Sequence, residues 1–330
     1  MKPTGEAQHF VVLDGWRGLS ILFVLAAHLL PIGPKSWHLN SMVGPLGMVI
    51  FFILSGFLIT NFLLERSNLV DFLIRRFFRI LPLAWLYMGI ALAGSHATAN
   101  SYWAHFLFYA NWPPMQVGGI TSHLWSLCVE VQFYVGIALL ITLLGRRGLL
   151  LIPIICIAVT WYRYVNGVHI AINTYFRIDE ILAGSALALI FNNRLGSWIR
   201  EFLKFLNQWF LLILLLVSCH PDGGFMNYLR PYIAAMLVGA TLFNKQSQIS
   251  TVLRNRVLHY FAMTSYALYI IHPLLADIWL GSGVGMEKYI KRPLLFATII
   301  IMAHASTFYY EHKWIALGKR ISARLCLYFR

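Results

Sequence analysis

The sequence predicts an all-α, polytopic integral membrane protein of about ten transmembrane helices, with both termini in the cytoplasm. Three observations lead to this fold class: 59% of the 330 residues are hydrophobic, only 12% are charged, and the apolar residues gather in runs of membrane-spanning length. A soluble domain of this length has no core large enough to bury so much apolar surface, whereas a bilayer can solvate it. We expect one membrane domain over residues 1–330, ending in a short basic cytoplasmic tail at 313–330.

Each expected span is an apolar run of about 17–25 residues, the length needed to cross the hydrocarbon core. The seventh run is shorter than the others. In chain order the expected spans are 14–31, 43–64, 79–95, 125–144, 149–165, 176–191, 208–219, 229–243, 260–280 and 293–312.

The basic residues indicate the orientation of these spans. With the N-terminus inside, 18 of the 26 Lys and Arg residues fall in inner segments and 7 in outer loops or at outer span ends, while Arg17 lies within the first span. Cytoplasmic loops carry such an excess of Lys and Arg, so we expect an even number of spans. Because the net charge of +14 is spread over short clusters between apolar runs, the expected partner is the lipid bilayer and not nucleic acid.

The four cysteines show no metal-ligand spacing and mostly fall in apolar runs. We expect them to be buried apolar side chains, and we expect neither a disulfide nor a metal site. The first apolar run has no small-residue cleavage site after it, so we expect it to remain in the mature protein as a spanning helix.

The first span carries the strongest candidates for chemistry, because a cation and an imidazole are costly in hydrocarbon. Arg17 and His28 are eleven positions apart, which places them on nearly one face of a helix and roughly 16 Å apart along its axis. The charge count puts Arg17 near the cytoplasmic end and His28 near the outer end. Asp14 precedes Arg17 by one turn and can pair with it, either within a site or as an ion pair at the membrane boundary.

Two further motifs lie on the second and third spans. Ser55 and Gly56 interrupt an apolar helix and predict close packing against a neighbouring helix. Arg76 and Arg79 are one turn apart at the cytoplasmic side, where they suit a phosphate-rich ligand or, alternatively, simple positive-inside anchoring. Pro82 follows and is expected to kink the helix.

The fourth span begins at its outer end with polar residues and carries a carboxylate. Glu130 lies about one and a half turns inside the span, where a carboxylate needs a partner or a cavity. It is the best candidate to orient His28 or to share its proton, and His123 is a candidate second base or acceptor contact. The substrate-binding candidates of this segment are His123, Trp125, Ser126 and Tyr134.

Other polar and aromatic segments have simpler interpretations. Residues 96–124 lack Lys and Arg and are rich in Trp, Tyr and Phe, which fits either an interfacial aromatic belt or a lid whose rings stack on sugars. The polar residues at 177–180 and 265–273 are expected to pair with groups close to them. The first of these segments contains Arg177, Asp179 and Glu180. Glu311 and its neighbour His312 are expected to mark the end of the last span.

These motifs together resemble the membrane acyltransferase-3 family, which O-acylates bacterial glycans and some antibiotics. The resemblance covers essentially the whole chain, and its specificity lies in the order of the motifs. Positions 128 and 131 are Cys and Val, where relatives often carry a small polar residue and an acidic one. The matching stretches are Leu13–Gly18 with the Arg17-x10-His28 spacing, Phe51–Ile59, Arg76-x2-Arg79, Trp125–Tyr134 and Ser265–Pro273.

The resemblance implies an O-acyltransferase of the bacterial inner membrane that has no permanently bound cofactor. Its acyl donor would be cytoplasmic acetyl-CoA, and its acceptor a hydroxyl of an extracytoplasmic glycan or glycolipid-linked sugar. Many relatives carry an extra extracytoplasmic hydrolase-like domain. This sequence shows only a short basic tail after the last expected span, so it is expected to be a stand-alone transferase. The implied catalytic residues are His28 and Glu130. The residues implied in CoA binding are Asp14, Arg17, Arg76 and Arg79.

Two questions stay open at the level of sequence. His28 would either deprotonate the sugar hydroxyl or carry the acyl group itself. The alternative function is a proton-coupled transporter or flippase that uses the intramembrane charges as a pathway, although the sequence lacks the inverted repeat typical of transporters. The acceptor sugar, the length of the acyl chain and the oligomeric state are not specified by the sequence.

Overall fold

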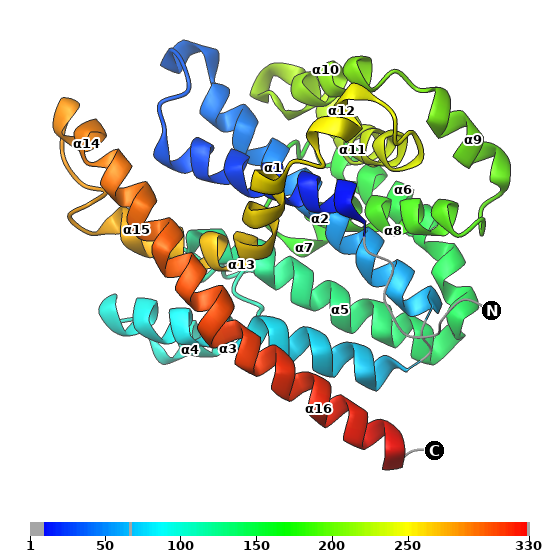
Figure 1. Ribbon diagram of the computed structural model, residues 1–330, viewed down its shortest axis with the longest axis horizontal. Helices are drawn as coiled ribbons and strands as arrows, with labels where there is room; N and C mark the ends of the chain where they lie inside the picture. The colour runs from blue at the N-terminus through cyan, green and yellow to red at the C-terminus, as the bar shows by residue number, and fades with distance from the viewer. Residues whose placement is uncertain (1–9, 66–67, 329–330) are drawn as a thin grey trace. The chain divides into compact units, whose positions relative to one another are not determined.

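The computed structural model describes residues 10–65 and 68–328, and these residues form helices and no strand (Figure 1). The predicted all-α class is therefore confirmed. Three residues that the charge count places in the cytoplasm, Lys2, Arg66 and Arg330, lie outside the described residues.

The helices divide into two compact units. Unit 1 comprises Met1–Ser67, Arg146–His169 and Asp179–Met263, and unit 2 comprises Asn68–Gly145, Ile170–Ile178 and Thr264–Arg330. The expected single domain over 1–330 stays a prediction.

Unit 1 is built around the long apolar helix α2, which packs against α1 and α8, with α11 packed on α2 and α8. A hydrogen bond from Trp16 Nε1 to Thr241 Oγ1 of 2.9 Å ties α1 to α11. Its α-helices are α1 (Val11–Leu29), α2 (Leu39–Glu65), α6 (Ile152–Val165), α8 (Asp179–Phe191), α9 (Ser197–Phe205), α10 (Gln208–Cys219), α11 (Met226–Phe243) and α12 (Gln248–Val252). Short 3-10 turns are η1 (Lys35–Trp37), η3 (Arg146–Leu151) and η4 (Pro221–Gly223).

Glycine allows α2 and α8 to approach each other closely. A Cβ atom on Gly56 would lie 1.9 Å from the Ile181 carbonyl oxygen, and one on Gly184 would lie 2.1 Å from that of Ile53. Any larger side chain at either position would push the helices apart. The packing role predicted for Gly56 is confirmed.

Unit 2 places its C-terminal helix beside α3 (Figure 1). The expected tail 313–330 is thus largely helical, and Ser322 donates a hydrogen bond to Asp71, which also pairs with Arg75. The unit contains α3 (Leu69–Gly94), α4 (Ala99–Phe106), η2 (Gly119–Leu124), α5 (Trp125–Leu144), α7 (Thr174–Arg177), α14 (Met286–Ile290), α15 (Arg292–Ala305), the π-helical segment η5 (Ser306–Glu311) and α16 (His312–Tyr328). The division between the units falls inside α13 (Arg256–Asp277).

Six helical segments of the described residues are long and apolar enough to cross a bilayer, or seven if the bent pair α9–α10 counts as one span. They overlap the first five expected spans and the tenth. Leu69–Gly94 begins ten residues before the expected third span, and Met286–Leu325 extends beyond the expected 293–312 at both ends. The other four expected spans coincide with α8, α10, α11 and α13, which are shorter or carry more polar residues, such as Asn227 and Arg230 in α11. The expected count of ten therefore stays a prediction.

The exposed surfaces of several helices are apolar, as a lipid-facing surface requires. On α6, Ile154, Ile157 and Trp161 are exposed and follow the i, i+3, i+7 spacing of one helix face. The polar residues Thr160 and Arg163 lie on the opposite side, and Arg163 is buried. This distribution is the reverse of a soluble protein and fits a multi-pass membrane protein.

Within unit 2, the aromatic segment 96–124 is bound to α3 and α5 by side-chain hydrogen bonds. Gln132 Nε2 donates to the carbonyl oxygen of Phe108 at 2.6 Å, and Trp112 Nε1 donates to Gln132 Oε1 at 2.9 Å. Tyr87 Oη donates to the carbonyl oxygen of Ile120 at 2.6 Å. The rings of Trp103 and Trp112 nonetheless remain exposed, and the choice between an aromatic belt and a lid stays a prediction.

Candidate functional site

The first candidate residues lie on one unbroken helix of unit 1. Asp14 and Arg17 form an ion pair on α1, with 3.6 Å between Asp14 Oδ1 and Arg17 Nη1, and His259 Nδ1 lies 3.5 Å from Asp14 Oδ2. His28 lies in the last turn of α1 and its side chain is exposed. The predicted pairing of Asp14 with Arg17 is confirmed, and helix geometry keeps Arg17 and His28 about 16 Å apart along the axis.

In unit 2, Glu130 and Arg76 meet at Tyr134. The Tyr134 hydroxyl donates to Glu130 Oε1 at 2.5 Å, and the guanidinium of Arg76 interacts electrostatically with both groups. Glu130 is 7% exposed and Tyr134 is fully buried. The carboxylate therefore has the partner that its depth in the helix requires.

Arg79 extends this cluster toward the surface. It is exposed and interacts electrostatically with Glu311, which the π-helical segment η5 presents and which accepts hydrogen bonds from Ser306 and Thr307 at 3.1 and 3.3 Å. Single π-helical turns occur often at functional sites. Arg76 and Arg79 thus face carboxylates of their own unit, and their expected contact with CoA phosphates stays a prediction.

The start of α5 forms a second polar group in unit 2. Ser126 Oγ lies 2.6 Å from Tyr269 Oη, whose hydroxyl also donates to the carbonyl oxygen of His123. His123 and Ser126 are buried, while Trp125 is half-buried with the guanidinium of Arg177 5.4 Å from its ring centroid. The substrate-binding candidates His123, Trp125 and Ser126 therefore sit together.

The structure thus divides the predicted site residues between the two units. Unit 1 holds Asp14, Arg17 and His28. The predicted orientation of His28 by Glu130 joins residues of different units and stays a prediction. The site residues of unit 2 are Arg76, Arg79, His123, Trp125, Ser126, Glu130 and Tyr134.

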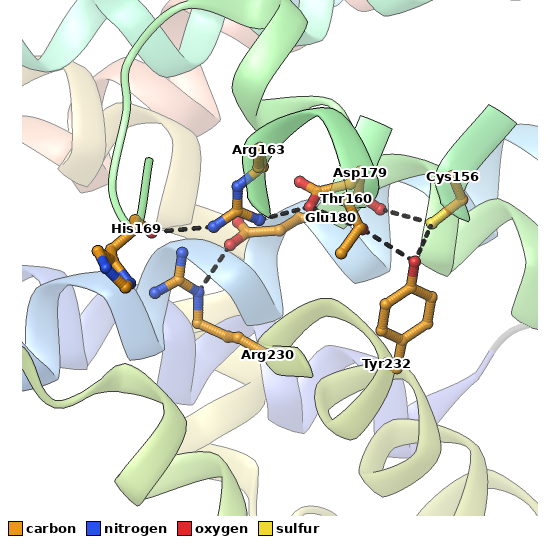
Figure 2. A network of polar contacts seen from close by, with 8 residues as sticks. All are labelled: Cys156, Thr160, Arg163, His169, Asp179, Glu180, Arg230 and Tyr232. Carbon is orange, nitrogen blue, oxygen red and sulfur yellow. Dashed lines mark hydrogen bonds and ion pairs between the residues drawn. The ribbon is translucent and has the colours of Figure 1, made fainter. Parts of the chain in front are cut away.

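A network of buried charges in unit 1 joins α6, α8 and α11 (Figure 2). Adjacent carboxylates at the start of α8 pair with arginines of two different helices: Asp179 with Arg163 of α6, and Glu180 Oε1 with Arg230 Nε of α11 at 2.9 Å. All four side chains are at most 2% exposed. Charges buried in a membrane domain need such partners, because an isolated one is costly.

Neutral side chains complete this network (Figure 2). Tyr232 Oη donates to Thr160 Oγ1 at 2.9 Å, and Thr160 Oγ1 donates to Asp179 Oδ2 at 3.2 Å. Cys156 Sγ donates to the Asp179 carbonyl oxygen at 3.3 Å. Cys156, Thr160 and Arg163 share one face of α6 because they are spaced i, i+4, i+7. Local charge satisfaction was the expectation for Asp179 and Glu180, but their partners come from distant helices.

The roles of four residues could not be predicted from the sequence: Arg163, Arg230, Gln132 and Tyr269. A polar residue inside an apolar run was the available signal in each case, but the partner of each is set by tertiary packing. Among the described residues, no group of three or more His, Cys, Asp or Glu side chains is arranged to hold a metal ion.

Comparison with known proteins gives a family match over most of the chain. A family model described as an acyltransferase domain, the acyltransferase-3 model, matches residues 10–312. No solved structure matches the chain.

Curated relatives are O-acetyltransferases by name. The chain is 28% identical over 309 residues to the peptidoglycan O-acetyltransferase OatA of Listeria monocytogenes, an alignment that covers 79% of this chain and 48% of the relative. It is 26% identical over 314 residues to the putative peptidoglycan O-acetyltransferase YrhL of Bacillus subtilis, with 79% and 47% covered. A putative O-acetyltransferase of Staphylococcus aureus is also 26% identical, with 79% and 49% covered. The chain spans about half the length of these relatives.

Proposed function

The chain belongs to the acyltransferase-3 family, and from this premise we propose that it is a membrane O-acetyltransferase that moves an acetyl group from cytoplasmic acetyl-CoA to a hydroxyl of an extracytoplasmic glycan. The observation that carries the proposal is the family match over residues 10–312. The names of the relatives support acetyl as the acyl group and a cell-wall glycan as the acceptor class. The proposed location is the bacterial inner membrane.

The geometry of α1 supports a donor and an acceptor on opposite sides of a membrane. One continuous helix carries a cation near its start and an imidazole in its last turn. The axial distance between Arg17 and His28 resembles the reach of the pantetheine arm of CoA. Arg17 would hold the charged end of CoA, and His28 would meet the thioester at the other end of the helix.

The proposed transfer exchanges a thioester for an ester. A sugar hydroxyl oxygen attacks the thioester carbonyl carbon, the carbon–sulfur bond breaks, and the CoA sulfur leaves with the proton that the hydroxyl gives up. His28 either takes that proton as general base or first accepts the acetyl group itself and passes it to the sugar. Trapping acetyl-histidine in a single turnover without acceptor would select the second route.

In unit 2, the proposed catalytic carboxylate is Glu130. Its hydrogen bond with Tyr134 and the nearby Arg76 guanidinium fix the carboxylate in one orientation, as a group that handles protons requires. Arg76 and Arg79 remain the proposed phosphate contacts for CoA in this unit, because Arg79 is exposed and an arginine fork suits phosphate.

The direct test is replacement of His28. Purified protein in lipid nanodiscs is given labelled acetyl-CoA and soluble peptidoglycan glycan strands, and labelled glycan is counted. His28→Ala is expected to reduce transfer by about 10²–10⁴-fold, the usual contribution of a positioned acid or base. His38→Ala, an exposed histidine of the same unit, is the control. Full transfer by His28→Ala would contradict the proposal, as would glycan uptake into sealed proteoliposomes by the wild-type protein without any acetylation.

A further inference from the structure

The start of α1 lies directly against the segment that joins α12 to α13 in unit 1. A Cβ atom on Gly15 would lie 2.0 Å from the carbonyl oxygen of Leu253. One on Gly18 would lie 2.2 Å from the carbonyl oxygen of Leu258. Only glycine allows so close an approach to another backbone. The two segments are therefore fixed against each other at the level of Arg17, the cation that would hold the charged end of CoA.

An ionic contact lies on one side of this crossing. Asp14 Oδ1 is 3.6 Å from Arg17 Nη1, and Asp14 Oδ2 is 3.5 Å from His259 Nδ1 of α13. The side chains of Asp14, Arg17 and His259 are 17%, 20% and 40% exposed. The contact is therefore at the surface of unit 1, where a ligand reaches it without entering the core.

Helix periodicity places a second arginine beside this contact. Arg256 precedes His259 by three positions on α13, as Arg17 follows Asp14 by three positions on α1. Residues three apart lie on the same side of a helix and one turn from each other. Each helix thus carries an arginine one turn from the Asp14–His259 contact. Arg256 is exposed, and no carboxylate among the described residues pairs with it.

Further positive charge surrounds these two arginines. Arg254 and Lys245 are exposed, and Arg254 Nη2 donates to the carbonyl oxygen of Lys245 at 2.7 Å, which ties the two residues to one loop. Against these cations, Asp14 supplies one carboxylate. Such an excess of positive charge attracts an anion that carries more than one negative charge. We call the following four residues the Arg17 cluster: Arg17, Lys245, Arg254 and Arg256.

The predicted topology places the Arg17 cluster on the cytoplasmic side. Residues 244–259 lie between the eighth and ninth expected spans, and Arg17 lies near the cytoplasmic end of the first. CoA is a cytoplasmic compound whose pyrophosphate and 3′-phosphate concentrate several negative charges at one end. Guanidinium groups bind such phosphates through paired, charge-assisted hydrogen bonds. The cluster therefore suits the phosphate end of CoA.

We propose that Arg256 and Arg254 bind the phosphates of acetyl-CoA together with Arg17, so that the turn between α12 and α13 is part of the donor site. This inference rests on the proposed function, because it assigns residues to the donor that the proposed function uses. It adds to that site a segment far from Arg17 in the sequence. It also gives a reason for the close packing at Gly15 and Gly18, which fixes the distance between the arginines.

The test uses a competitor that carries phosphates but no thioester, adenosine 3′,5′-bisphosphate. Purified protein in phosphatidylcholine nanodiscs is given glycan strands and labelled acetyl-CoA. Arg256→Gln is expected to raise the KM for acetyl-CoA about five- to tenfold and the inhibition constant of the competitor by a similar factor, with kcat changed less than about twofold. Arg254→Gln is expected to act in the same direction. Arg256→Lys keeps the charge and should recover part of the loss.

A matched control is available in the same unit. Arg194 is exposed and lies between the sixth and seventh expected spans, on the same predicted side of the membrane. Arg194→Gln makes the same change in net charge and is expected to leave the KM for acetyl-CoA unchanged. Thermal unfolding of each purified variant checks that it is folded.

The phosphate of an anionic lipid headgroup is the other anion that suits this cluster. Nanodiscs of phosphatidylcholine alone and nanodiscs that also contain phosphatidylglycerol distinguish the two sources. The inference predicts the same effect of Arg256→Gln on the KM for acetyl-CoA in both. An effect that appears only with phosphatidylglycerol would show that the cluster binds lipid, and the inference would be wrong.

The remaining outcomes separate this inference from the proposed function. An unchanged KM for acetyl-CoA in Arg256→Gln overturns the inference, as does an equal rise in Arg256→Gln and Arg194→Gln. A competitor that inhibits Arg256→Gln as strongly as the wild type, or that inhibits neither, also overturns it. In all these cases the wild-type protein still acetylates glycan and the proposed function stands. A wild-type protein that transfers no acetyl group from acetyl-CoA to glycan overturns the proposed function itself.

Discussion

At the level of single residues, Tyr134 is where a buried acid and a basic side chain of unit 2 meet. Its hydroxyl donates to Glu130, and the Arg76 guanidinium interacts electrostatically with both groups. Removing that oxygen leaves both charged residues in place but removes the charge-assisted hydrogen bond to Glu130, which is stronger than a neutral one. The phenyl ring itself packs against Phe72 with ring centroids 5.8 Å apart, so the packing of the ring does not depend on the hydroxyl.

Tyr134→Phe is therefore expected to lower kcat for glycan acetylation about tenfold to a hundredfold, the effect of about 1.4–2.8 kcal/mol. The protein should remain folded, since no ring contact is lost. Tyr232→Phe is the control, because it removes a hydroxyl that donates to Thr160 in unit 1. Steady-state kinetics of both variants measure the difference. Equal kcat values for the two variants would show that Tyr134 has no special role.

The residue pairs show which contacts can be predicted from sequence. Asp14 and Arg17 are one helical turn apart, and helix geometry alone brings them together. Arg76 and Tyr134 come from different helices, and nothing in their spacing predicts their contact. From the sequence alone, Arg76 suits a phosphate ligand and Glu130 suits His28. Nothing in the sequence indicates that Arg76 lies near Glu130.

At the level of elements, the start of α8 connects three helices of unit 1 through two buried ion pairs (Figure 2). Loss of one partner would leave a buried charge without compensation. Asp179→Asn is therefore expected to destabilise the protein by about 3–5 kcal/mol, whereas the apolar double variant Arg163→Met/Asp179→Leu should recover most of that stability. Thermal unfolding in detergent measures both.

The exposed pair of Lys204 and Glu201 on α9 is the control for this experiment. Its nitrogen and oxygen are 2.7 Å apart, similar to a buried pair, but the side chains are 37% and 56% exposed. Glu201→Gln is expected to change stability by less than about 1 kcal/mol. If the double variant were as unstable as Asp179→Asn, the ion pair itself, and not the compensation of a buried charge, would be needed for folding.

The elements that could be predicted are those whose signal is local. Apolar runs located α1, α2, α5 and α6 to within a few residues, and Gly56 marked the close crossing of α2 with a neighbour. For α3 the apolar run located the end but not the start, because the helix begins at Leu69, ten residues before the expected span, in a stretch that carries Asp71, Arg75 and Arg76. The neighbour itself, α8, could not be predicted. The charged first turn of α8 gave its start but not its partners, because Arg230 is 50 positions from Glu180.

At the level of the whole molecule, the structure changes which basic residues count as loop charges in predicting the membrane orientation. Of the seven Lys and Arg residues that the sequence analysis counted on the outer side, Arg163, Arg177, Arg230 and Arg292 are buried. Arg163 and Arg230 pair with buried carboxylates, and Arg177 lies against the ring of Trp125, so these three are not loop charges. The orientation rule concerns charges in short loops, so the outer side carries fewer charges against the predicted orientation than the count of seven suggests.

The predicted orientation can be tested at the C-terminus, where the number of spans has a direct consequence. An even number of spans places both termini on the same side, whereas the seven spans obtained by counting α9–α10 as one would place them on opposite sides. Green fluorescent protein fused after Arg330 is expected to fluoresce, and alkaline phosphatase at the same position to be inactive, because the predicted C-terminus is cytoplasmic. Fusions within the loop at Lys35–Trp37 should give the opposite result. Active phosphatase at the C-terminus would show either that α1 runs in the opposite direction across the membrane or that the number of spans is odd. If α1 is reversed, His28 lies at the cytoplasmic side. The proposal that acetyl groups cross the membrane along α1 is then wrong.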